Sequence, residues 1–127
     1  MKKILTPLVI ILAFISYTAC KKSSISDGPG EVYGKWKLTE TLFDPGDGSG
    51  KYTKVKEDKY LTMYKEGKME GDALPDLSAF KIVDSVTMEV TSKTYNRVLP
   101  YRYKATANTL VLNPPCFEGC GYKFVRQ

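Results

Sequence analysis

The chain lacks histidine entirely and has only three cysteines in 127 residues. Without histidine, the Ser-His-Asp and Cys-His arrangements of nucleophilic catalysis are excluded. A metal site would also lack the imidazole ligand and would need more donors than the cysteines supply. The acidic residues of the segment 44–50 do not follow the Asp-x-Asp-x-Asp-Gly spacing of an EF-hand loop. We therefore expect no enzymatic activity, no metal and no cofactor.

The chain also lacks a strong charge imbalance and a hydrophobic run of membrane-spanning length. Its 19 Lys and Arg residues stand against 14 Asp and Glu, a formal net charge of +5. Loss of Lys2 and Lys3 with a leader peptide lowers this by two, to +3. A charge this small and scattered does not predict a nucleic-acid partner.

An uncharged, apolar segment covers residues 4–19, directly after Lys2 and Lys3. It is shorter than the ~20 residues that a spanning helix needs. Ala19 precedes Cys20, which gives the segment the layout of a signal peptide with a lipobox-like end. We predict a signal peptide over residues 1–19, lipidation at Cys20, and a flexible tether over residues 20–30. An ordinary signal peptide with a chance cysteine, or a short anchor helix, is the alternative.

Residues 31–127 are enough for one domain with a single core. Period-two alternation of apolar and polar residues predicts short strands within 33–43, 60–65, 86–91, 101–107, 110–112 and 122–126. Turn-forming residues separate them at 44–50, 65–68 and 107–109, and a longer loop at 71–78 is expected to hold one helical turn near 75–79. The pattern predicts an all-β domain and leaves a barrel and a sandwich both open.

One feature of the first predicted strand bears on a binding site. Trp36, Leu38 and Leu42 share a face, and Glu40 falls on the same parity. Glu40 would then contact a ligand inside the domain, or lie solvated at its mouth.

The segment Gly34-Lys35-Trp36 and the late Arg126 resemble the Gly-x-Trp start and C-terminal arginine of the lipocalin superfamily. The endings Pro115-Cys116-Phe117-Glu118-Gly119-Cys120 and Tyr122 to Arg126 are similar to those of small lipocalin-like lipoproteins of Bacteroidetes. The resemblance implies a small antiparallel up-and-down β-barrel over residues 31–127, preceded by a signal helix. It also implies that Trp36 plugs the closed end and that Arg126 lies across its indole as a cation–π contact.

Cys116 and Cys120 are the cysteines that remain once Cys20 is lipidated. In an exported protein, such a pair suggests a disulfide. The three residues between them allow the turn that a bridge requires. Free thiols or a redox-active pair are the alternatives.

Two functions follow from this sequence. The first is a membrane-anchored lipoprotein of the cell envelope, in the outer membrane, that binds a small apolar or amphipathic ligand in the barrel. The candidate lining residues are Leu38, Glu40, Leu42, Met63, Met88, Tyr101 and Tyr103. The second is a structural or interaction lipoprotein whose barrel is filled by its own side chains and docks onto an envelope protein. An enclosed cavity of the size that ligands need would separate them.

Overall fold

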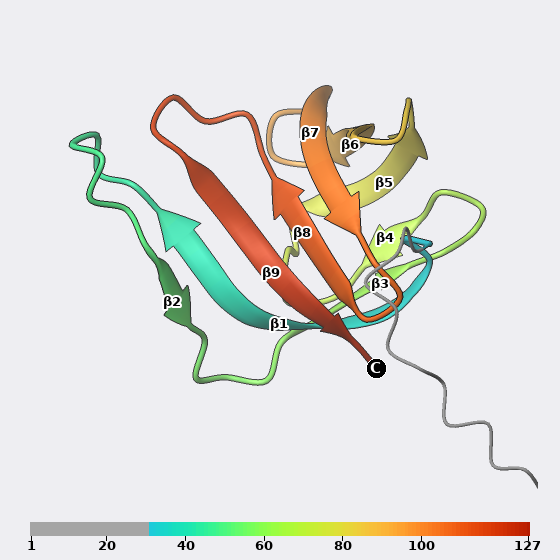
Figure 1. The fold of residues 1–127 in the computed structure, drawn as a ribbon. Coiled ribbons are helices and arrows are strands. Elements are labelled where there is room, and N and C mark those ends of the chain that lie inside the picture. Colours follow the sequence, from blue (N-terminus) through green and yellow to red (C-terminus); the bar gives the residue numbers. More distant parts are fainter. Residues whose placement is uncertain (1–30) are drawn as a thin grey trace, which may run out of the picture.

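The computed structural model describes residues 31–127 (Figure 1). The predicted signal peptide with its helix, Cys20 and the tether lie outside this range. The described chain forms nine strands and no helix: β1 (Gly34–Phe43), β2 (Tyr52–Lys54), β3 (Tyr60–Met63), β4 (Met69–Glu70), β5 (Leu77–Ile82), β6 (Thr87–Ser92), β7 (Arg97–Ala105), β8 (Thr109–Asn113) and β9 (Cys120–Arg126). The predicted all-β class is confirmed.

The strands form one antiparallel sheet in the order β4-β3-β1-β9-β8-β7-β6-β5. β3 pairs with the first half of β1, and β2 pairs with its second half. The sheet curls until β4 and β5 meet. There Lys68 and Ala79 form a bridge, and the Phe80 backbone N–H donates to the Gly67 carbonyl over 2.8 Å. The result is a nearly closed, eight-stranded barrel, and its up-and-down architecture is the one that the resemblance implied.

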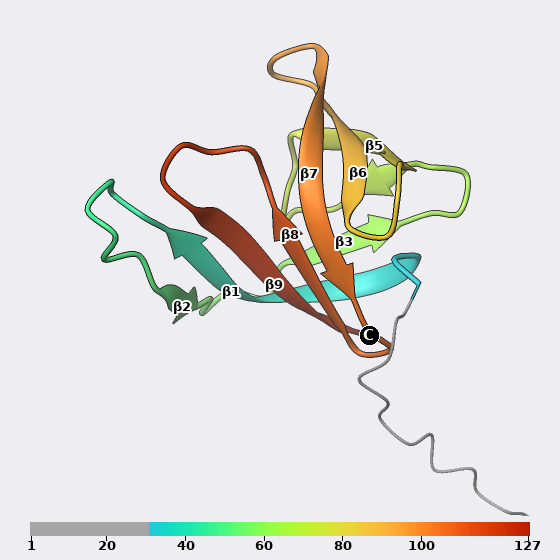
Figure 2. The ribbon, with the colours of Figure 1, turned by 45° about the horizontal axis from the view of Figure 1, so that its top comes forward.

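The barrel has two different ends (Figure 2). β1 begins, and β9 ends, at what we name the tryptophan end, which also holds the turns at 64–68, 83–86 and 106–108. The opposite end, named the loop end, holds the connections at 44–51, 71–76, 93–96 and 114–119. In both views the β1–β2 and β8–β9 connections project away from the C-terminus.

Side chains of the barrel itself fill its interior. Alternate residues of the strands point inward, and the largest of them are almost completely inaccessible to solvent. This group comprises Trp36, Leu61, Met63, Met69, Met88, Val90, Leu110, Leu112 and Phe124. The core therefore runs from the tryptophan end well into the barrel.

The helical turn predicted at 75–79 is wrong, because β5 already begins at Leu77. A β-bulge lies at Ser78: Leu77 pairs with Ser92, and the next pair is Ala79 with Thr91. The extra residue places both Leu77 and Phe80 inside the barrel, where both are buried. Apolar residues three apart are also typical of a helix face, which explains the wrong prediction.

Candidate functional site

Arg126 organises the tryptophan end. Its guanidinium lies over the indole of Trp36, with Cζ 4.2 Å from the ring centre. Its nitrogens donate to three backbone carbonyls: Nε to Ala107 over 2.7 Å, Nη1 to Tyr33 over 2.7 Å, and Nη2 to Glu31 over 2.5 Å. The contact between Trp36 and Arg126 that the resemblance implied is confirmed. It joins the last strand to the segment that leads into the first.

The position of the Arg126 side chain also requires a glycine at position 34. Its φ of 126° lies where residues with a side chain are strained, and an added Cβ would lie 2.9 Å from Arg126 Nη1. The indole N–H of Trp36 donates to the Val32 carbonyl over 2.8 Å, so the buried ring has its polar atom satisfied. The residues of the sequence signature thus hold this end shut, which is a structural role.

A β-bulge at Thr39 reverses the side-chain alternation of β1. Leu38 pairs with Phe124, and the next pair is Glu40 with Lys123. Phe124 is buried inside the barrel, so its neighbour Lys123 points outward. Glu40 therefore lies on the outer wall, where its Oε2 is 3.0 Å from Lys123 Nζ. The expected inward direction of Glu40 is wrong.

Leu42 follows Glu40 to the outer wall, and its expected inward direction is also wrong. It pairs with Gly121 of β9 on one side and with Tyr52 of β2 on the other. Lys123 Nζ lies 3.9 Å from the centre of the Tyr52 ring. These residues form a patch on the outside of the barrel and do not line a cavity.

Of the other candidate lining residues, all except Tyr103 belong to the hydrophobic core. Leu38, Met63 and Met88 are buried within the hydrophobic core and pack against other side chains there. Tyr101 is buried, whereas Tyr103 is only partly buried, and its hydroxyl donates to the Asp84 carbonyl over 2.8 Å. The structure therefore brings the inward residues together as a packed core.

A polar cluster lies beneath the loop end. The carboxylate of Asp76 accepts hydrogen bonds from the Ser92 hydroxyl and the Thr94 backbone N–H, both over 2.6 Å. These bonds lower the pKa of Asp76. Burial, with smaller contributions from Tyr122 and Asp76, raises the pKa of Tyr101 to about 12. Tyr101 thus keeps its proton throughout the physiological range.

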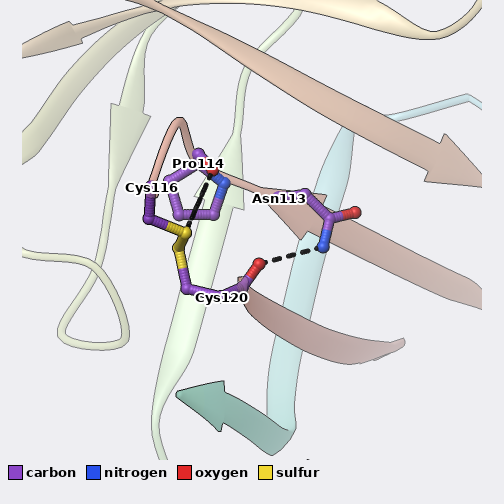
Figure 3. The surroundings of a disulfide bond; sticks show 4 residues. All are labelled: Asn113, Pro114, Cys116 and Cys120. Carbon is purple, nitrogen blue, oxygen red and sulfur yellow. Dashed lines mark hydrogen bonds between the residues drawn. A yellow bond between two sulfur atoms is a disulfide. The ribbon is translucent and has the colours of Figure 1, made fainter. Parts of the chain in front are cut away.

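The predicted disulfide joins Cys116 and Cys120 in the β8–β9 connection, with their Cα atoms 6.3 Å apart (Figure 3). Asn113 Nδ2 donates to the Cys120 carbonyl over 3.1 Å. The Pro114 carbonyl oxygen lies 3.6 Å from Cys116 Sγ and 3.7 Å from Cys120 Sγ. Phe117 lies between the two cysteines, so the bridge fixes the short loop that carries it.

Two phenylalanine side chains are exposed at the loop end. Phe43, at the end of β1, is 78% exposed, and Phe117 is 108% exposed. Both border one surface depression of about 570 Å³, which the disulfide loop 116–120, Asp44 and Tyr122 complete. An exposed phenylalanine leaves a large apolar area in water, and burial against a partner would remove it.

Acidic groups flank these phenylalanines. Asp44 accepts hydrogen bonds from the backbone N–H groups of Gly46, Gly48 and Gly50 at 2.8–3.2 Å, and these lower its pKa. The carboxylate of Glu118 lies over Gly46, so close that a Cβ there would lie 2.6 Å from Glu118 Oε1. The β1–β2 and β8–β9 connections are therefore in contact and form one surface.

Phe43 and Phe117 escaped the sequence reasoning. Phe43 is the last residue of the predicted strand 33–43, where an apolar residue is expected to be buried. Phe117 lies between the predicted strands 110–112 and 122–126. The sequence held one usable signal for Phe117. It lies between two closely spaced cysteines, and a residue in the turn that their disulfide closes cannot belong to a strand.

No protein-family model, no curated protein and no solved structure matches this chain. Its class is therefore defined by its architecture: a small, filled, antiparallel up-and-down barrel. Within residues 31–127, no helix is long and apolar enough to cross a membrane. The same range contains no group of three or more His, Cys, Asp or Glu residues placed to hold a metal ion.

Proposed function

We propose that this chain is a lipid-anchored lipoprotein of the cell envelope that docks onto a protein partner through its loop end. The observation that carries the proposal is the exposure of Phe43, at the end of β1, and of Phe117, in the β8–β9 connection, where the two connections contact each other. Lipidation at Cys20, the outer-membrane location and the relation to lipocalins belong to the same proposal. The leader pattern supports the first two, and the contact between Trp36 and Arg126 supports the third.

The geometry suits an interface anchor. Phenylalanine is among the residues enriched in protein interfaces. At ~25 cal/mol per Å² of apolar surface, burying one ring contributes a few kcal/mol. The disulfide holds Phe117 in place before binding, which lowers the entropy that association costs. Asp44 and Glu118 beside the rings favour a partner whose apolar pocket is bordered by Lys or Arg.

The filled interior favours docking over ligand binding. The surface depressions are bordered by loop residues and by β7, and their lining includes Phe43, Arg102 and two of the candidate residues, Tyr101 and Tyr103. Leu38, Met63 and Met88, the apolar candidates for a ligand site, are occupied by core packing. The protein therefore acts through its outer surface in this proposal.

Site-specific photo-crosslinking in cells that naturally make this protein tests the proposal. We expect benzoylphenylalanine at position 117 to give a discrete protein adduct. The same probe at Val86, which is exposed at the tryptophan end, serves as the matched control. A second substitution, Phe43→Ser, should reduce the adduct formed from position 117. Equal adducts from both positions, or none from 117, would contradict the docking proposal.

The anchor is tested separately. A clickable fatty-acid analogue should label the wild-type chain and should fail to label a Cys20→Ser variant. Label on the variant would refute the site.

A further inference from the structure

The outer wall of β7 carries two neighbouring cations. Arg102 and Lys104 are two residues apart and exposed, so both side chains project from the same face of the strand. Their Cα atoms are about 6.6 Å apart along an extended strand. Across β8, Arg102 is opposite Asn113, and Lys104 is opposite Val111.

These cations border a surface depression of about 530 Å³. Its other polar side chains are Ser85, Tyr103, Thr106 and Asn113, and no Asp or Glu lines it. The size falls in the range of small-molecule sites. Tyr103 and Asn113 already donate to the carbonyls of Asp84 and Cys120, and the hydroxyl of Thr106 is bonded to that of Thr109. The depression thus offers two positive charges and the hydroxyl of Ser85 to whatever enters it.

Arg102 and Lys104 have no ion-pair partner within residues 31–127. Four lysines of the same range do have one: Lys37 with Asp58, Lys59 with Glu57, Lys68 with Glu70 and Lys123 with Glu40.

Arg102 acts electrostatically on the carboxylate of Asp84. The pKa of Asp84 is lowered mainly by hydrogen bonds from the backbone N–H of Val86 and from the backbone and side chain of Thr87, and the guanidinium of Arg102 makes the smallest contribution. Asp84 Oδ1 accepts those two N–H groups at 2.9 and 2.7 Å and so remains committed to its own turn. Arg102 and Lys104 are therefore both available to an external anion.

We propose that this depression is a binding site for phosphate groups. The guanidinium of Arg102 has the planar fork that pairs with two phosphate oxygens, and Lys104 supplies a second, compact charge. Ser85 adds a hydroxyl donor at the rim. Two sources share this chemistry in a cell envelope: the phosphate of a lipid headgroup, and free phosphate. The proposal is independent of docking at the loop end.

Binding to two soluble probes tests the proposal and separates the sources. The full-length chain, purified in non-ionic detergent, is titrated with inorganic phosphate and with dihexanoyl phosphatidic acid. Dihexanoyl phosphatidylcholine is the control lipid. We expect saturable binding of phosphatidic acid, of inorganic phosphate, or of both, and the stronger of the two identifies the source.

The double variant Arg102→Gln, Lys104→Gln should weaken that binding at least about tenfold, since hydrogen bonds to charged groups are lost. The matched variant Lys51→Gln, Lys54→Gln removes the same charge elsewhere and should change it less than about twofold. Circular dichroism should show that both variants fold, because all four side chains are exposed. Equal weakening by the two variants would reveal general charge attraction and overturn the proposal. The absence of saturable binding to either phosphate probe would do the same.

Discussion

The two ends of this barrel use aromatic side chains in opposite ways. At the tryptophan end, Trp36 is fully buried beneath Arg126, and its only polar atom is hydrogen-bonded. At the loop end, Phe43 and Phe117 stand in solvent beside acidic groups. The first arrangement contributes to stability and the second does not. The difference indicates that one end maintains the fold while the other remains free to bind.

The largest effect is expected from Trp36→Ala. Removal of a fully buried indole should lower the free energy of unfolding by about 3–5 kcal/mol. Phe117→Ala, a comparable truncation at the loop end, should change it by less than about 0.5 kcal/mol. Urea denaturation followed by far-UV circular dichroism measures both. Similar losses for the two variants would remove the distinction between the ends.

A smaller effect is expected from Gly34→Ala. The positive φ costs about 1–2 kcal/mol, and displacement of Arg126 weakens a charged hydrogen bond, so the total loss should be about 3 kcal/mol. Gly48→Ala is the control, because Gly48 also has a positive φ but has open space around it. The loss of stability in Gly48→Ala therefore measures the cost of the positive φ without a steric contact. If both variants lose the same stability in urea denaturation, the contact with Arg126 is not important.

Removal of the disulfide should have a moderate effect. The variant Cys116→Ser, Cys120→Ser opens a five-residue loop, and the loop-closure relation gives a loss of about 2 kcal/mol. Since the bridge lies in a surface connection, the barrel should still fold. Far-UV spectra and urea midpoints of the variant and the wild type provide the measurement. A variant that fails to fold would show that the loop end also maintains the core.

The smallest effect concerns alkaline pH. The pKa of Tyr101 is raised to about 12 in the folded chain, above the ordinary tyrosine value of 10.0. The unfolded chain therefore loses this proton first. The stability linked to Tyr101 is fully present below pH 10 and is lost as the pH rises through 12.

In Tyr101→Phe, the fall in urea midpoint between pH 9 and pH 11 should be shallower than in the wild type. Tyr95→Phe, at an exposed tyrosine of the loop end, is the control and should follow the wild type. If the urea midpoint of Tyr101→Phe falls as steeply with pH as that of the wild type, the ionisation of Tyr101 does not cause the loss of stability.

The sequence predicted the strands with strong alternation, such as those containing Met88 and Tyr103, because one buried face leaves a clear pattern. It predicted the contact between Trp36 and Arg126 only through a family resemblance. It failed at the bulges of Thr39 and Ser78, where one extra residue reverses which side chains point inward. No residue type marks these bulges, so the outward direction of Glu40 required the structure.

Strands β2, β4 and β5 were also missed. β2 and β4 have three and two residues, too few for any alternation to be recognised. β5 has six residues, but the bulge at Ser78 interrupts its alternation. The exposed phenylalanines were missed for another reason, since exposure depends on where the connections lie in space and not on residue type.

The place of β1 and β9 in the barrel has a mechanical consequence. The described chain begins at the tryptophan end and leads directly into β1, whereas the disulfide loop leads into β9 at the loop end. If the anchor pulls at one end and a docked partner at the other, these two adjacent antiparallel strands are drawn in opposite directions along their length. All the pairs from Trp36–Arg126 to Phe43–Cys120 then resist the force at once. The barrel would transmit tension between membrane and partner in shear, without peeling open one hydrogen bond at a time.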